Sequence, residues 1–156
     1  MGFAVKSNVL VMDFIGKDMK PAPKLRDVEG DVEKFSEIYL EVIEKMRVLY
    51  QECKLIHADL SEYNMLYWDN KVYIIDVSQS VEHDHPHALD FLRRDIFNIN
   101  EFFRRKKVHV FRDWNVFQFI VALGIPKGKE KEELEKIVDD YIHCEEENSK
   151  KSGENS

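Results

Sequence analysis

The chain has 156 residues, which is enough for one domain with a single buried core. Its content of 44% hydrophobic and 12% aromatic residues indicates a globular chain and excludes general disorder. A net charge of −7 means that a global electrostatic footprint for nucleic acid is absent, and no apolar run is long enough to span a membrane.

The first third of the chain predicts a strand, a connector and a long helix. Residues 9–12 form a short apolar run, which predicts a strand buried on both faces. Residues 16–23 contain two prolines and predict a connector. From residue 31 to residue 53 the apolar side chains recur every three or four positions, which predicts an amphipathic helix with one face in a core.

The middle of the chain predicts a small β element. Residues 55–57 are consistent with a brief strand. The apolar segments 65–67 and 72–75 flank Asp69-Asn70-Lys71, and this arrangement predicts a hairpin. An acidic residue, Asp76, follows the second of these segments directly.

The rest of the chain predicts helices. Pro86 suits the first turn of a helix that runs to about Lys106. Apolar spacing predicts a third helix over 114–121 and a fourth over 134–141, followed by about a dozen polar residues that we expect to be frayed. The expected fold class is therefore α+β, mostly helical with a minor β element.

Some chemically suggestive residues have ordinary interpretations. The basic run Arg104–Lys107 is typical of a solvated helix end, although it leaves a local basic patch open. Alternate positions in one segment are occupied by His83, His85 and His87, and in an extended segment this spacing would place the three imidazoles on one side, as metal binding requires. We favour instead a loop whose histidines cap helices or contact phosphate. The two cysteines indicate neither a disulfide framework nor a metal site, so a reducing cytoplasm is the default compartment.

One set of polar residues carries a recognisable chemistry. Asp59 and Asn64 lie five positions apart in the segment His-Ala-Asp-Leu-Ser-Glu-Tyr-Asn, and Asp76 follows 17 positions after Asp59, beyond the predicted hairpin. A hairpin folds the chain back, so its two ends can meet in one cleft. Phosphoryl transfer needs oxygen ligands for Mg²⁺ and a carboxylate that orients the attacking hydroxyl. The order matches H-x-D-L-x-x-x-N followed by a strand that ends in Asp.

This pattern assigns Asp59 as the base, and Asn64 and Asp76 as metal ligands. A lone Asp at the end of a strand is usually a turn former or a helix cap. The conjunction of both segments with the predicted loop, hairpin and strand favours a kinase-like phosphotransferase.

Longer segments resemble the RIO family of atypical protein kinases. Residues 55–66 (LIHADLSEYNML) resemble its catalytic loop, and residues 74–81 (IIDVSQSV) resemble its metal-binding loop. Residues 85–95 (HPHALDFLRRD) resemble the stretch that follows, and residues 11–16 (VMDFIG) resemble the hinge. The combination is closest to the first RIO subfamily and covers roughly residues 5–110.

The resemblance implies a serine/threonine protein kinase, or an ATPase with that fold, that uses ATP and Mg²⁺. By position, Met12 is the expected gatekeeper, and Asp13 and Ile15 are expected to bind adenine through backbone groups. Asp76 is also expected to carry phosphate transiently. The implied setting is cytoplasmic, in late maturation of the small ribosomal subunit, with a pre-ribosomal particle (protein and rRNA) as partner and with no membrane or DNA.

The resemblance divides the chain into the last N-lobe strands and hinge (1–16), a RIO C-lobe (17–125), and a C-terminal helix with a polar tail (126–156). Kinases need a glycine-rich loop, a strand lysine and a helix glutamate before the hinge. Only eleven residues precede Met12. We therefore expect a fragment, an incomplete gene model or a truncated paralogue that is inactive alone, in which the strand over 9–12 has an uncovered apolar edge.

Two other functions stay open on the sequence alone. One is a small-molecule phosphotransferase of the aminoglycoside or choline kinase type, which shares the H-x-D loop. Ser61 and the Asp-Val-Ser-Gln-Ser run starting at Asp76 argue against it. The other is a non-catalytic lobe that still docks on a ribosomal particle. Nucleotide turnover separates both enzymes from the docking module, and the acceptor, protein or metabolite, separates the two enzymes.

Overall fold

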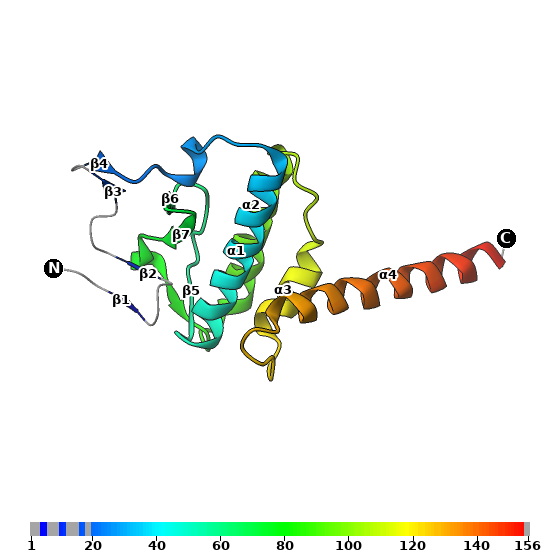
Figure 1. Cartoon of the computed structure of the whole chain (residues 1–156). Coiled ribbons are helices and arrows are strands. Elements are labelled where there is room, and N and C mark those ends of the chain that lie inside the picture. The colour runs from blue at the N-terminus through cyan, green and yellow to red at the C-terminus, as the bar shows by residue number, and fades with distance from the viewer. Residues whose placement is uncertain (1–3, 6–9, 12–15, 18–19, 155–156) are drawn as a thin grey trace.

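The structure, a computed structural model, describes residues 4–5, 10–11, 16–17 and 20–154. This part of the chain contains four α-helices and eight short strands, with four strands before α1, four between α1 and α2, and the last three helices in succession (Figure 1). In chain order these elements are β1 (Ala4–Val5), β2 (Leu10–Val11), β3 (Gly16–Lys17), β4 (Lys20–Pro21), α1 (Val32–Gln51), β5 (Leu55–Ile56), β6 (Met65–Trp68), β7 (Lys71–Ile74), β8 (Val81–Glu82), α2 (Ala88–Arg105), α3 (Asp113–Val121) and α4 (Glu130–Glu154).

Helix α1 lies at the centre of the core, as its apolar periodicity predicts. It begins after Asp31, whose carboxylate accepts a hydrogen bond of 2.9 Å from the backbone N–H of Lys34, and this cap satisfies a free donor of the first turn. Its buried face contacts α2, α3 and the hairpin strand β7. The core therefore lies between the helices on one side and the small sheet on the other (Figure 1).

The predicted hairpin is confirmed, with a tighter turn than expected. Strands β6 and β7 pair antiparallel from Met65 opposite Ile74 to Trp68 opposite Lys71, so Lys71 belongs to the strand. The turn consists of Asp69 and Asn70, which have φ angles of 51° and 60°. Asp and Asn tolerate this left-handed conformation better than most residues, and two-residue turns of this kind match the twist of a hairpin.

The hairpin belongs to a four-stranded sheet with the order β1-β2-β7-β6. Strand β2 pairs parallel with β7 and antiparallel with β1. The expectation of an uncovered edge along the strand over 9–12 is therefore wrong for its described residues, because β2 is internal and β1 forms the edge. The expected connector over 16–23 contains the paired strands β3 and β4. Strands of two residues in a segment with prolines give no recognisable sequence pattern, so they were not predicted.

The predicted helices α2, α3 and α4 are also present. Helix α2 begins at Ala88, two residues after Pro86. Helix α4 continues to Glu154, so the frayed tail expected there is helical, and the helix projects away from the rest of the chain (Figure 1). Within the described part of the chain, no helix combines the length and the apolar character that crossing a membrane requires.

Buried polar contacts join the helices. The Tyr39 hydroxyl on α1 donates to Asn100 Oδ1 on α2 at 2.6 Å and accepts from the Phe111 N–H at 3.2 Å. The Arg47 guanidinium on α1 donates to carbonyl oxygens at the end of α3, including Phe119 O at 2.7 Å. These bonds satisfy buried groups that would otherwise cost stability, and they hold α1 against α2 and α3.

Candidate active site

The loop between β5 and β6 is held from α2 by a buried carboxylate. Asp95 is 1% exposed and accepts hydrogen bonds from the backbone N–H groups of Ala58, at 2.8 Å, and Leu60, at 3.1 Å. Its neighbour Arg94 donates to the Ala58 carbonyl oxygen. Ala58 has a φ of 72°, a conformation that alanine adopts only where the surroundings impose it. Residues 94 and 95 thus fix the backbone on both sides of Asp59.

Burial dominates the chemistry of Asp95. Removal from water raises the pKa of its carboxyl to about 6, although the Leu60 and Ala58 N–H groups and the nearby His57 and Arg94 act to lower it. The carboxylate form is therefore retained at neutral pH by these polar contacts. Protonation would leave fewer acceptor sites for the two backbone donors.

His57 connects the same loop to the segment after the hairpin. Its ring is 1% exposed, and its Nδ1 accepts a hydrogen bond from the Asp59 N–H at 3.2 Å. When Nδ1 accepts in a neutral imidazole, Nε2 carries the proton, so Nε2 donates to the Ile75 carbonyl oxygen at 2.9 Å. The buried imidazole thereby holds the backbone next to Asp59 close to the backbone next to Asp76.

Asn64 makes the second connection between these segments. Its carbonyl oxygen accepts from the Ile75 N–H at 2.9 Å, which continues the hairpin pairing by one step. Its side-chain Nδ2 donates to the Asp59 carbonyl oxygen at 2.6 Å. This bond uses the amide nitrogen and leaves Oδ1 available to a cation.

Asp76 follows in the left-handed conformation, with φ 56° and ψ 66°, which turns the chain sharply after β7. The Ser78 hydroxyl donates to its Oδ1 at 2.9 Å, so Oδ2 remains available. The Asp59 and Asp76 residues are exposed, and Asn64 is half-buried. The three residues that the sequence singled out therefore lie on loops joined at one end of the hairpin, two of them open to solvent.

Other predicted site residues have different outcomes. Met12, Asp13 and Ile15 lie outside the described residues. His85 and His87 are exposed, with ring centroids 5.9 Å apart, and the His87 N–H donates to His85 Nδ1 at 3.0 Å. His87 is the N-cap residue of α2 but its side chain makes no capping hydrogen bond, so the expected capping of a helix by His87 is wrong, and the expected contact of these histidines with phosphate stays a prediction.

Sequence reasoning missed the supporting residues Asp95 and Arg94. One signal for Asp95 was present: this acid follows Leu92 by three positions and precedes Ile96 on the apolar stripe of α2, where an ionisable side chain needs buried partners. No local pattern indicates which backbone groups those partners are, because they lie 35 and 37 positions earlier.

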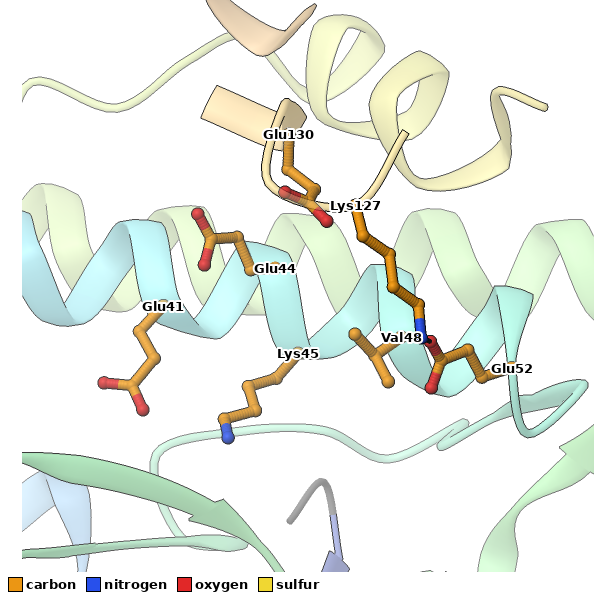
Figure 2. A pocket seen from close by; sticks show the side chains of 7 residues that line it. All are labelled: Glu41, Glu44, Lys45, Val48, Glu52, Lys127 and Glu130. Carbon is orange, nitrogen blue, oxygen red and sulfur yellow. Dashed lines mark ion pairs between the residues drawn. The ribbon is translucent and has the colours of Figure 1, made fainter. Parts of the chain in front are cut away.

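A separate hollow of about 390 Å³ lies between α1 and the loop that leads into α4 (Figure 2). Lys127 on that loop pairs with Glu52 on α1, with 3.5 Å between Nζ and Oε1. Burial, followed by the charges of Glu130 and Glu41, raises the pKa of Glu44. The hollow contains none of the three predicted catalytic residues. Its lining residues are Glu41, Glu44, Lys45, Val48, Glu52, Lys127 and Glu130.

Comparison with known proteins identifies the family. The profile of the RIO domain family matches residues 2–115. The chain belongs to the RIO domain family. Serine/threonine-protein kinase rio1 of Dictyostelium discoideum is 53% identical over 135 residues, which cover 86% of this chain and 24% of that protein. Human serine/threonine-protein kinase RIO1 is 58% identical over 121 residues, covering 78% of this chain and 21% of that protein.

The RIO3 kinase of Homo sapiens is 45% identical over 145 residues, which cover 88% of this chain and 28% of that protein. The chain thus spans about a quarter of the length of these curated relatives. A crystal structure of Rio2 kinase from Chaetomium thermophilum, described as an ADP/Mg²⁺-phosphoaspartate complex, matches with a TM-score of 0.54 and 24% identity. The match covers 88% of this chain and 45% of the Rio2 kinase chain. A match of 24% identity shows that the two proteins share the α+β fold and no more.

Proposed function

We propose that this RIO domain is the catalytic lobe of a serine/threonine protein kinase or ATPase that transfers the γ-phosphoryl group of ATP. The observation that carries the proposal is the set of hydrogen bonds that joins the Asp59 loop, Asn64 and the Asp76 segment at one end of the hairpin. The curated relatives, which are named serine/threonine-protein kinases, support the same reaction class.

In this proposal Asp59 is the base. Its carboxylate is exposed, while the backbone on either side is fixed by Asp95, so the carboxylate keeps a constant position relative to an incoming hydroxyl. The hydroxyl oxygen attacks the γ-phosphorus, the bond to the bridging oxygen of ADP breaks, and Asp59 accepts the hydroxyl proton. Most of the catalytic effect is then positioning and charge stabilisation.

The donor atoms left available at the site suit Mg²⁺. Asn64 Oδ1 and Asp76 Oδ2 are hard oxygen ligands that the hydrogen bonds of the site do not occupy, and Mg²⁺ completes its shell with phosphate oxygens and water. When bound with nucleotide, the ion would neutralise charge on the phosphates. Among the described residues, no group of three or more His, Cys, Asp or Glu could hold a metal ion. The protein donors that we propose are therefore one amide oxygen and one carboxylate oxygen, from Asn64 and Asp76.

The remaining roles are proposed from the family resemblance. Met12 is the gatekeeper, and Asp13 and Ile15 bind adenine through backbone groups. Asp76 is also the residue on which a transient phosphoaspartate would form, as the description of the Rio2 complex suggests for that protein. In that cycle a carboxylate oxygen attacks the γ-phosphorus, ADP leaves, and water later releases phosphate. We place this activity in the cytoplasm, in late maturation of a pre-ribosomal small-subunit particle.

A chimera tests the reaction class. The part of this chain that aligns with human RIO1 kinase, 58% identical over 121 residues, would replace the corresponding segment of that kinase. Radiolabelled ATP is offered with Mg²⁺ and either a generic protein acceptor or a panel of aminoglycosides and choline, with Asp59→Asn as the control.

We expect label on protein, or released phosphate, that disappears in the control. Label on a small molecule would instead favour the metabolite kinase. A folded chimera without any turnover would favour a docking module, and either result would contradict the proposal.

A further inference from the structure

A second surface feature lies next to the catalytic loop but outside the candidate active site. It is an open hollow of about 290 Å³ between the 3₁₀ turn Leu25–Asp27, the catalytic loop and the last turn of α2. It includes part of the basic run that the sequence left unassigned. Its lining residues are Arg26, Glu62, Tyr63, Phe102, Arg105 and Lys106.

The hollow is richer in positive charge than the chain as a whole, which carries −7. Three cations line it, and two more flank them on the end of α2 and just beyond it. These five residues are Arg26, Arg104, Arg105, Lys106 and Lys107.

Three acids partly offset these cations. Asp27 lies 3.6 Å from the Arg26 guanidinium, Glu62 lies 3.2 Å from that of Arg105, and Glu101 pairs with Arg104. The Glu62 side chain is only 14% exposed whereas that of Arg105 is 67% exposed, so the positive group faces the solvent. The Arg26–Asp27 and Arg104–Glu101 pairs are exposed and therefore weak, about 0–1 kcal/mol. The Arg105 guanidinium has further N–H donors on its exposed side, so a phosphate can bind there while the bond to Glu62 is kept.

Aromatic rings lie among the cations. Tyr63 is 48% exposed, and the Arg26 guanidinium lies over its ring at 4.7 Å from the centroid. The Lys106 ammonium lies 5.2 Å from the ring centroid of Phe35 and 5.8 Å from that of Phe102. Such pairs orient cations at the edge of a hollow. A ring and a guanidinium plane that are both exposed are also the two surfaces on which nucleobases stack in proteins.

We infer that this surface binds single-stranded RNA, with a base stacked on Tyr63 and Arg26 and the adjoining phosphates at Arg105 and Lys106. Cations interleaved with an exposed aromatic ring are the pattern of single-strand binding, whereas a phosphopeptide needs the cations alone. The lining comes from a 3₁₀ turn, a loop and the end of a helix, whereas a duplex groove is read by a whole helix or a two-stranded ribbon. The choice of RNA over DNA rests on the proposed ribosomal function.

This surface lies next to the proposed metal ligand Asn64. Tyr63 directly precedes Asn64, and the Arg26 N–H donates to the Glu62 carbonyl oxygen at 3.2 Å. RNA bound to this surface would therefore contact the loop that carries the proposed metal ligand. The proposed RNA surface and the candidate active site would therefore share the loop between β5 and β6.

Fluorescence anisotropy of the whole chain with a labelled oligo(U) of about 12 nucleotides tests the inference. Arg105→Gln with Lys106→Gln removes two phosphate contacts while keeping most of each stem, and we expect at least about tenfold weaker binding and a salt dependence that is less steep by about 1.4 in log–log slope. The matched control is Lys150→Gln with Lys151→Gln on the exposed end of α4, which should bind as the unaltered chain does.

A second pair of variants tests the stacking. Tyr63→Ala should weaken binding by about tenfold, while Tyr63→Phe, which keeps the ring, should stay within about twofold. Circular dichroism of each variant verifies that the fold is retained. No binding by the unaltered chain, or equal losses in the two double variants, would overturn the inference.

Two further arms decide the ligand class. Tighter binding of a phosphoserine peptide that shows the same variant dependence would overturn the assignment to nucleic acid, and equal or tighter binding of oligo(dT) would overturn the choice of RNA. The outcome is separable from the proposed function, because turnover by the chimera is measured without RNA. Turnover with no RNA binding refutes only this inference, and RNA binding with no turnover refutes only the enzyme.

Discussion

Replacement of Asp95 by Asn should change the pH dependence of stability. Asp95 is 1% exposed, and burial raises its pKa to about 6 from an ordinary value of 3.8. A carboxyl whose folded pKa lies above its unfolded value binds more protons when folded, so the folded state gains stability as the pH falls through about 6. Asparagine is neutral at every pH and removes this contribution.

The size of the effect follows from the two pKa values. Ionisation of Asp95 is about 3 kcal/mol less favourable in the folded chain than in the unfolded chain. Between pH 7 and pH 5 the unfolded carboxyl stays ionised while the folded one becomes protonated, so the unaltered chain should gain about 1 kcal/mol from this group. The amide introduced by Asp95→Asn accepts from one of the two backbone donors only, and the unsatisfied donor costs about 1–3 kcal/mol at all pH values.

Urea unfolding at pH 5, 6, 7 and 8, followed by tryptophan fluorescence, measures both terms. The free energy of unfolding of the unaltered chain, minus that of Asp95→Asn, should rise by about 1 kcal/mol from pH 7 to pH 5. The difference between the chains isolates this group, because other titrating residues such as Glu44 are common to both. Parallel pH profiles for the two chains would refute the assignment of a raised pKa to Asp95.

Three other substitutions test the scaffold by urea unfolding. Tyr39→Phe removes the hydroxyl that donates to Asn100 at 2.6 Å and should cost about 1–3 kcal/mol, whereas an unchanged midpoint would contradict this role. Arg47→Met removes the donor to Phe119 O at 2.7 Å and should cost a similar amount, with faster amide exchange at the end of α3. Asn70→Val, at a φ of 60°, should destabilise by about 1–2 kcal/mol, while Asn70→Gly should stay within about 1 kcal/mol; equal effects would argue against the left-handed turn.

Periodicity was sufficient to predict the larger elements. The apolar spacing of α1 and α2, and the turn residues Asp69 and Asn70, are local signals, so the sequence alone located two long helices and the hairpin. The two-residue strands β3 and β4 carry no periodicity and were missed. The pairing of β2 with β7 joins residues 64 positions apart, and no local pattern encodes such a contact.

The candidate site divides in the same way. The chemical types and order of Asp59, Asn64 and Asp76 were readable because phosphoryl transfer constrains them, and the hairpin between them is a local structure. The contacts that support the site are not local. His57 acts through the Ile75 carbonyl, and Asp95 acts through backbone groups of a distant loop, so both depend on the packed core rather than on a motif.

The division of roles between Asp59 and Asp76 is the central claim, and one paired measurement in the chimera with human RIO1 tests it. Asp59→Ala and Asp76→Ala are compared for binding of Mg²⁺-ATP by calorimetry and for phosphoryl transfer. Asp59→Ala should lower turnover by at least about 10²-fold and leave the Kd for Mg²⁺-ATP nearly unchanged, because we propose that Asp59 contacts the attacking hydroxyl and not the nucleotide. Asp76→Ala should weaken Mg²⁺-ATP binding itself. Weaker nucleotide binding with Asp59→Ala and unchanged binding with Asp76→Ala would contradict the account.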